Sequence, residues 1–140
     1  MGLAQLDNLV RIRQLKVEPA AQSEIDGLVR SGKSRLKDAR TESLSLDARF
    51  DLTYNAAHTY SLAAPRWHGY RSENRYIVFQ CLEHKKMSAE QWRVLDQAHR
   101  KRNLAEYEGH LEVDRNLVEA IIRIAAEVAI RVTALGPLNP

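Results

Sequence analysis

Apolar side chains recur three or four residues apart along most of the chain, which is the spacing of helices that bury one face. The pattern is clearest between Asp114 and Gly136. An apolar face there lies opposite a ladder of charges that alternate in sign at every fourth position. The face comprises Leu117, Ile121, Ile124, Val128, Val132 and Leu135, and the ladder comprises Arg115, Glu119, Arg123, Glu127 and Arg131. This segment is predicted to form a long helix with Asp114 as its N-cap and Gly136 as its stop.

Two earlier segments show the same periodicity. The first follows Pro19, a residue that suits the first turn of a helix, and continues to about Ser43. The second starts at Ser45, a favourable N-cap, and ends where Pro65 should kink the helix and Gly69 should stop it. Both segments are predicted to be long helices.

The remaining segments give weaker helical signals. A short helix is expected within residues 3–17, another over 72–82, and a longer one over 88–108, which Ser88 and Gln91 open as a capping box. No segment shows period-two alternation between turn signals, so no sheet is predicted. The fold class is therefore expected to be all-α, a compact up-and-down bundle of four to five helices.

Length and composition indicate a single globular domain. The chain has 140 residues, of which 44% are hydrophobic and 28% charged. We expect residues 1–19 to be an N-terminal extension, residues 20–135 the bundle and residues 136–140 a frayed tail. The single cysteine, Cys81, cannot form an intrachain disulfide and is expected to be buried.

No stretch reaches the roughly 20 apolar residues that span a bilayer. Residues 1–17 contain no basic segment followed by an apolar run, as a signal peptide would. A cytoplasmic protein without membrane contact is therefore expected.

The chain has 21 basic and 18 acidic residues, an excess that is compatible with nucleic-acid contact without requiring it. The basic residues gather in two clusters. The earlier cluster is interpreted as a solvated helix face and consists of Arg30, Lys33, Arg35, Lys37 and Arg40. The later cluster is a candidate binding region and consists of His99, Arg100, Lys101 and Arg102.

One segment, Gly27 to Ser34, satisfies the phosphate-loop pattern GxxxxGK[ST]. That loop needs a buried strand immediately before it, and residues 20–26 are instead polar and spaced like a helix. We interpret the match as a coincidence inside a helix. The five histidines show no metal-ligand spacing either, so neither a metal nor another cofactor is predicted.

The helix predicted over 88–108 carries an unusual arginine. Its apolar stripe passes through Leu95 and Ala98 and returns at Ala105, which places Arg102 on the inward face. A cation there costs desolvation free energy unless a partner meets it. Two explanations remain open: a structural ion pair, or a site that faces a second copy or a ligand.

Two stretches of the sequence resemble the HEPN superfamily. Residues 51–64, followed by Trp-His-Gly-Tyr-Arg at 67–71, are similar to the family's small-residue helix that ends in a Gly-aromatic turn. Arg102 and Asn103, followed by Tyr107, are similar to its Arg-x-x-x-x-His region. The resemblance spans roughly residues 20–135 in helix order and length, and it implies a helical bundle that is usually dimeric.

The resemblance also implies functional positions. It places Arg102 on the family's arginine and Asn103 on its frequent polar neighbour, in a cleft shared by two protomers. Members with the complete motif are typically metal-independent ribonucleases, often paired with a minimal nucleotidyltransferase antitoxin. Here Tyr107 stands where the histidine is expected, although some HEPN subfamilies have a similar arrangement.

That substitution bears on chemistry. Metal-independent RNA cleavage needs an acid and a base that titrate near neutral pH. A histidine side chain titrates at about 6.5, whereas a tyrosine, at about 10, is a poor base at pH 7. His99, one turn before Arg102, is the nearby imidazole that could substitute.

Three functions remain open at this point. The favoured one is a non-nuclease interaction module, in a homodimer, that pairs with a minimal nucleotidyltransferase in a toxin–antitoxin-type system. The second is a metal-independent endoribonuclease toxin whose altered catalytic residues are Arg102, Tyr107 and His99. The third is a helical RNA- or DNA-binding protein that depends on Arg100 and Lys101 more than on Arg102.

Overall fold

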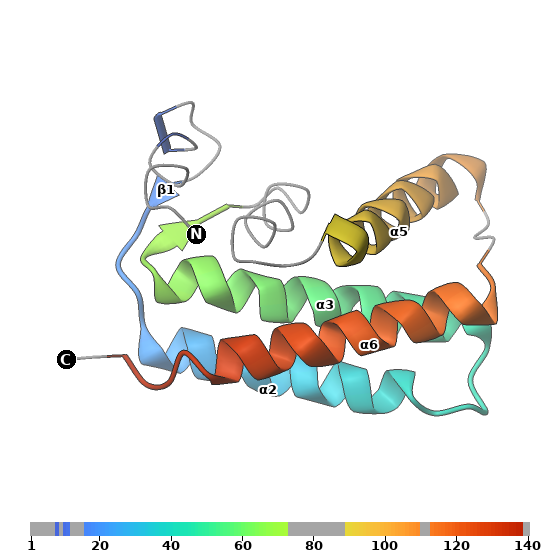
Figure 1. Cartoon of the computed structure of the whole chain (residues 1–140), viewed down its shortest axis with the longest axis horizontal. Helices are drawn as coiled ribbons and strands as arrows, with labels where there is room; N and C mark the ends of the chain where they lie inside the picture. The colour runs from blue at the N-terminus through green and yellow to red at the C-terminus, as the bar shows by residue number, and fades with distance from the viewer. Residues whose placement is uncertain (1–7, 9, 12–15, 73–88, 110–112, 139–140) are drawn as a thin grey trace.

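The computed structural model describes residues 8, 10–11, 16–72, 89–109 and 113–138 (Figure 1). Within that part of the chain lie four long helices and one pair of very short strands. In chain order these are β1 (Lys16–Val17), α2 (Gln22–Ala39), α3 (Leu46–Trp67), β2 (Tyr70–Arg71), α5 (Ala89–Glu108) and α6 (Arg115–Thr133). The predicted all-α helical bundle is confirmed. None of the described helices is long and apolar enough to cross a membrane.

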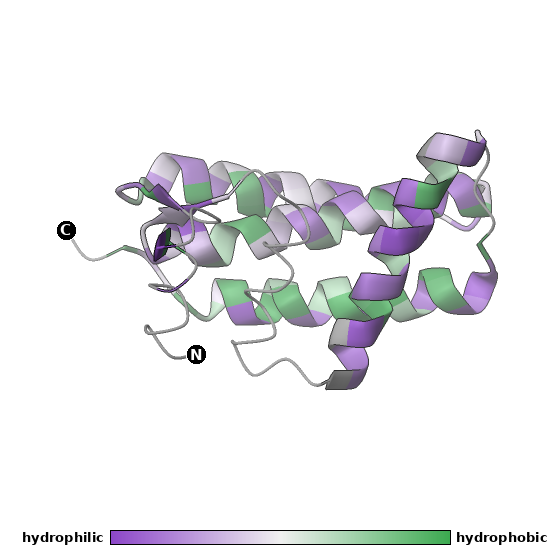
Figure 2. Cartoon of the chain, turned by 90° about the horizontal axis from the view of Figure 1, so that it is seen from above, coloured by the Kyte–Doolittle hydropathy of each residue, from purple (hydrophilic) through white to green (hydrophobic). Residues whose placement is uncertain are grey.

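Helices α2, α3 and α6 lie side by side along the long axis of the molecule, and α5 runs across them (Figures 1 and 2). The core fills the space between the three aligned helices. Its largest fully buried side chains come mainly from α3 and α6 and include Phe50, Tyr54, Val118, Ile121 and Val128. The apolar face predicted for the last helix is confirmed, because its central positions are all buried.

The helix ends follow the predicted capping chemistry in most places. The side chain of Ser45 accepts a hydrogen bond from the amide of Ala48, and Asp114 accepts one from Leu117. The predicted helix stops, Gly69 and Gly136, have φ angles of 87° and 73°, a left-handed conformation that favours glycine. Local sequence therefore defines these four boundaries.

Both ends of α2 differ from the prediction. Helix α2 begins at Gln22 rather than directly after Pro19, because residues 18–20 are extended beside β2. The same helix ends at Ala39 rather than at about Ser43. Helix α3 continues through Pro65 to Trp67 and stops before Gly69, as predicted. A proline in the last turn removes only one backbone hydrogen bond, which the packing of the buried Pro65 offsets.

The absence of a sheet was predicted wrongly. Strands β1 and β2 pair antiparallel, with Lys16 opposite Arg71 and Val17 opposite Tyr70. The amide of Glu18 extends the pairing by donating to the carbonyl of Gly69 at 2.9 Å. Strands of two residues are too short to produce an alternating pattern, so sequence periodicity could not reveal them. They join part of the predicted N-terminal extension to the bundle.

The described part of the tail that was predicted to be frayed, residues 136–138, makes hydrogen bonds with the bundle. The indole of Trp67 donates to the carbonyl of Gly136 at 3.0 Å, and the amide of Leu138 donates to the side chain of Gln22 at 2.7 Å. Both partners come from distant parts of the chain. Described residues 136–138 are therefore held against the ends of α2 and α3.

The phosphate-loop pattern lies inside a helix, as predicted. Residues 27–34 belong to α2, so their amide groups are committed to helical hydrogen bonds and do not form a loop around a phosphate. Gly32 instead allows α2 to pack closely against α3, because a Cβ atom at this position would lie 2.9 Å from the ring of Tyr60.

Several predicted features fall outside the described residues. These are the helix over 72–82, the buried thiol of Cys81, Ser88 of the capping box, and most of the short N-terminal helix.

Candidate functional site

The inner face of α5 meets α3 through a small polar cluster. Helix α5 is anchored there by Leu95 and Ala98, both fully buried. One turn further along, Nδ1 of the half-buried His99 lies 3.0 Å from the hydroxyl of Tyr54, which is itself almost fully buried on α3. Hydrogen bonds to buried polar groups stabilise by about 1 kcal/mol each, so this contact helps fix α5 on the bundle.

Arg102 stacks on the same tyrosine. Its guanidinium carbon lies 5.2 Å from the centre of the Tyr54 ring, within the range of a cation–π interaction. The side chain is half-buried. The inward position predicted for Arg102 is therefore confirmed, and the electron-rich face of an aromatic ring meets its charge. Such contacts contribute about 0.5–2 kcal/mol, depending on how far the cation is desolvated.

Asn103 completes this group, which we call the Tyr54 cluster: Tyr54, His99, Arg102 and Asn103. The side-chain nitrogen of Asn103 lies 3.2 Å from Nε2 of His99. An amide nitrogen can only donate, so the tautomer that fits both contacts accepts at Nε2 and carries its proton on Nδ1, directed at the Tyr54 hydroxyl. Both nitrogens of a neutral imidazole are thus engaged by neighbouring side chains.

The structure does not bring Tyr107 into this group. Its side chain is 93% exposed on the opposite side of α5. A separation of five residues rotates a position by about 140° from Arg102 around a helix, which explains the divergence. The polar cleft predicted from Arg102, Asn103 and Tyr107 together is therefore not formed within one chain.

The other two predicted binding residues, Arg100 and Lys101, differ in exposure. Arg100 is 79% exposed and forms an i,i+4 ion pair with Asp96 at 3.0 Å. Lys101 is half-buried. An exposed pair of this kind contributes about 0.3–0.5 kcal/mol and marks no binding site by itself.

A cleft of about 470 Å³ with a mixed apolar and charged lining opens between the first turns of α5 and the middle of α6. Its charged lining residues are Glu90, Arg123 and Glu127. It faces the N-terminal half of α5, before the segment that carries the Tyr54 cluster. Nowhere in the described ranges do three or more His, Cys, Asp or Glu residues lie close enough to hold a metal ion.

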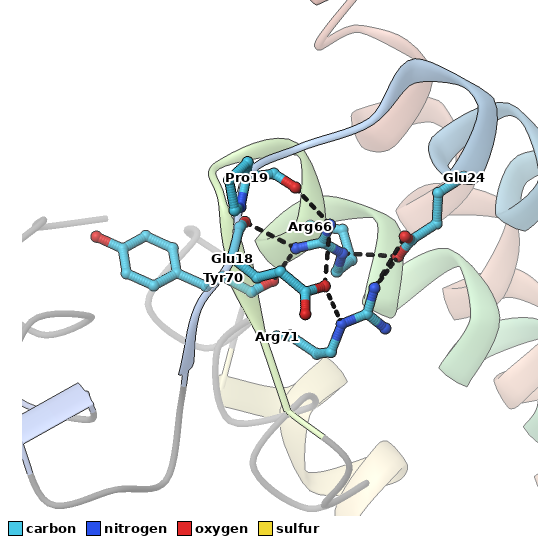
Figure 3. A network of polar contacts seen from close by, with 6 residues as sticks. All are labelled: Glu18, Pro19, Glu24, Arg66, Tyr70 and Arg71. Atoms are coloured by element: carbon cyan, nitrogen blue, oxygen red, sulfur yellow. Dashed lines mark hydrogen bonds and ion pairs between the residues drawn. The ribbon is translucent and has the colours of Figure 1, made fainter.

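A second polar network, which the sequence did not reveal, lies at the far end of α3 (Figure 3). Its centre is Arg66, whose side chain is only 3% exposed. The guanidinium donates to Glu24 at 2.6 Å and to the backbone carbonyls of Glu18, Pro19 and Tyr70 at 2.9–3.2 Å. Four acceptors therefore satisfy a cation that would otherwise be costly to bury.

The second arginine of this network, Arg71, is more exposed and binds the same two acids. It donates to both carboxylate oxygens of Glu24, at 2.7 and 2.8 Å, and to the carboxylate of Glu18. The hydrogen bond from Arg66 and the two positive charges hold the pKa of Glu24 below its ordinary value, and the carboxylates raise the pKa of Arg71. The network fastens residues 18–24 to the end of α3 and has the character of a structural clasp.

A signal for this clasp does exist in the sequence. Arg66 follows the apolar and small residues 62–65, at a position where the periodicity of α3 points inward. Like Arg102, Arg66 is therefore a cation on the inward face of a helix, a pattern that indicates a partner from another element.

Comparison of the sequence with models of protein families and with curated proteins, and of the fold with solved structures, finds no match. The resemblance to HEPN proteins therefore stays a prediction from the sequence.

Proposed function

We propose that this chain is a HEPN-like cytoplasmic protein that acts as a non-nuclease interaction module and docks a protein partner on the outer face of α5. The observation that carries the proposal is the exposure of Leu104 and Tyr107, at 54% and 93%, three residues apart on that face. Arg100 lies one turn before them. Tyrosine and arginine are the side chains that most often dominate binding free energy at protein interfaces.

The inner face of α5 supports the same interpretation. Leu95, Ala98 and the Tyr54 cluster attach α5 to the bundle, which leaves the opposite face available for a partner. Leu104 and Tyr107 thus place an apolar and an aromatic side chain together on the solvent-facing side of a mostly hydrophilic helix (Figure 2), where a partner could cover them. The HEPN resemblance suggests the kind of partner, a minimal nucleotidyltransferase in a toxin–antitoxin-type system.

The endoribonuclease alternative has less support. A general base needs a free basic atom within reach of the 2′-hydroxyl, and both ring nitrogens of His99 are engaged by Tyr54 and Asn103. Tyr107 projects away from Arg102. The described residues of a single chain therefore assemble no acid–base pair around the arginine.

A homodimer is part of the proposal, through the outer face of α6. Ile130 is 70% exposed on that face, among the alternating charges Arg123, Glu127 and Arg131. A two-fold axis near residue 125 would reverse the helix in the second copy and place Arg123 of each copy opposite Glu127 of the other. The charge ladders of the two copies would thus place opposite charges against each other, and the second copy would cover Ile130.

The docking proposal is tested with the small nucleotidyltransferase encoded beside this chain, where one is present. Isothermal titration should show a complex with the wild type that weakens at least tenfold in the double variant Leu104→Ser, Tyr107→Ser. Val17→Ser is the matched control, because it removes an equally exposed apolar side chain, 72% accessible, from a different element. Equal affinity of both variants would refute the docking face.

Catalysis is tested separately. Wild type, Arg102→Ala and Tyr107→His are incubated with structured and unstructured RNA in EDTA. We expect no robust cleavage by any of them, since position 107 lies on the wrong side of the helix to complete a site with Arg102. Strong cleavage by the wild type that disappears in Arg102→Ala would favour the ribonuclease alternative.

A further inference from the structure

Four basic side chains form a straight row on the outer face of α2, away from the Tyr54 cluster and from the outer face of α5. We call this row the α2 basic stripe; it consists of Arg30, Lys33, Lys37 and Arg40. All four are exposed, and successive members are three or four residues apart, so they project from one side of the helix. At about 1.5 Å per residue the row is about 15 Å long.

The charges of the α2 basic stripe are not neutralised within the part of the chain that the structure describes. None of the four side chains takes part in an ion pair there. Cations on other helices do pair along their own helix, as Arg100 does with Asp96 and Arg115 with Glu119. The α2 basic stripe therefore differs from an ordinary charged helix face, on which opposite signs alternate.

The acids of α2 do not compensate for the stripe. Glu24 is committed to Arg66 and Arg71, and Asp26 accepts a hydrogen bond from Gln22 at 2.8 Å. Asp38 lies about 100° around the helix from Lys37.

Like charges at these spacings repel. Arg30 and Lys33, Lys33 and Lys37, and Lys37 and Arg40 are three successive pairs of like charge, three or four residues apart. Such pairs destabilise a helix in the absence of an anion. A ligand with several regularly spaced negative charges would remove this repulsion and gain attraction at every position.

We propose that the α2 basic stripe binds the phosphodiester backbone of a nucleic acid without reading its sequence. A row of cations matches a row of phosphates, whereas a mononucleotide would need a pocket, and residues 27–34 form helix rather than a phosphate loop. A membrane surface fits less well, because a helix that lies on lipid inserts its apolar face. The apolar face of α2, including Ile25 and Leu36, is buried in the core instead.

The test measures binding of fluorescent single-stranded RNA, double-stranded RNA and double-stranded DNA of equal length at low and moderate salt. The triple variant Arg30→Gln, Lys33→Gln, Lys37→Gln should bind at least tenfold more weakly than the wild type. The binding constant of the wild type should fall as salt is added. A plot of its logarithm against the logarithm of the salt concentration should have a slope no steeper than about −3 to −4, as expected for four phosphate contacts.

The matched control removes the same charge elsewhere. Lys16→Gln, Arg93→Gln, Arg115→Gln neutralises three exposed cations on three other elements and should change affinity less than twofold. Thermal melting of both triple variants verifies that they remain folded. The α5 double variant Leu104→Ser, Tyr107→Ser should bind nucleic acid like the wild type, which separates this inference from the docking proposal.

Three results would overturn the inference. The first is an equal loss of affinity in both triple variants, which would indicate a response to net charge alone. The second is no binding of any nucleic acid at low salt. The third is binding only to vesicles that contain phosphatidylserine. Stabilisation by magnesium–ATP that Lys33→Ala abolishes would also count against it, since a mononucleotide site would then be present.

Discussion

At the scale of single residues, the positions hardest to interpret from sequence are those whose contact partners are distant along the chain. Gly32 completes a phosphate-loop pattern, yet its place is explained by the ring of Tyr60 on the neighbouring helix. Arg66 and Arg102 interrupt apolar stripes, and their partners come from other elements. Periodicity identifies such residues as inward-facing, but the identity of the partner needs the packed structure.

The two glycines of α2 should respond in opposite directions to the same substitution. Gly32→Ala should lower the free energy of unfolding by about 1–3 kcal/mol, because its Cβ atom would lie 2.9 Å from the buried ring of Tyr60. Gly27→Ala should raise it by about 0.5–1 kcal/mol, since no atom lies within 4 Å of a Cβ there and alanine favours the helix. Urea denaturation measures both, and effects of equal sign would contradict the packing described here.

The clasp around Arg66 should make stability depend on Glu24. In the folded state the pKa of Glu24 is lowered from its ordinary value of 4.5. The ionised carboxylate therefore contributes fully to the free energy of unfolding above pH 4.5, and this contribution is lost as the pH falls through the folded pKa. Glu24→Gln should therefore lower the free energy of unfolding at pH 7 by about 1–3 kcal/mol. The deficit should shrink below pH 4.5.

Denaturant titrations of wild type and Glu24→Gln over pH 3–7 would test this dependence. Glu42→Gln is the control, because Glu42 is exposed in the turn after α2 and lies outside the clasp. A deficit of constant size across the pH range would show that the carboxylate charge is not what stabilises the clasp.

At the scale of elements, the sequence predicts well those helices whose signals are local. Periodicity and caps located α3 and α6, including Ser45 and Asp114, because those signals depend on residues within one turn. The two strands were not predicted, because a strand of two residues is too short to show an alternating pattern of apolar and polar positions. Helix α5 was predicted as a helix with Leu95 and Ala98 buried, but its contact with Tyr54 could not be, because 45 residues separate Tyr54 from His99.

The attachment of α5 should depend on the hydroxyl of Tyr54. Tyr54→Phe keeps the ring under Arg102 and removes the hydrogen bond to His99, so unfolding free energy should fall by about 0.5–1.5 kcal/mol. Amide hydrogen exchange should accelerate in α5 more than in α2. Tyr60→Phe serves as the matched control, since Tyr60 is also buried and its hydroxyl has no hydrogen bond within the described residues. If amides of α5 exchanged equally fast in Tyr54→Phe and Tyr60→Phe, the Tyr54 cluster would not be what attaches α5 to the bundle.

At the scale of the whole molecule, helix order and fold class were predictable, and the distribution of surfaces was not. The sequence placed Arg102, Asn103 and Tyr107 in one cleft, whereas the bundle turns Arg102 inward onto Tyr54, leaves Asn103 exposed beside His99, and turns Tyr107 outward. Three outer faces result, each with its own chemistry: the tyrosine and leucine of α5, the alternating ladder of α6 and the α2 basic stripe. Which face a residue joins depends on how each helix is rotated against the core, which only the packing of all the helices determines.

The α6 face leads to a prediction about assembly. Light scattering at micromolar concentration should give a mass near twice the 16.0 kDa of one chain. Ile130→Arg should yield monomers, because a bulky cation replaces an apolar side chain, 70% exposed, beside Arg131 and would be buried against the second copy. Leu104→Ser should remain dimeric, since Leu104 lies on the outer face of α5. A wild-type monomer would exclude any site shared between protomers, and a dimeric Ile130→Arg would move the two-fold axis to another surface.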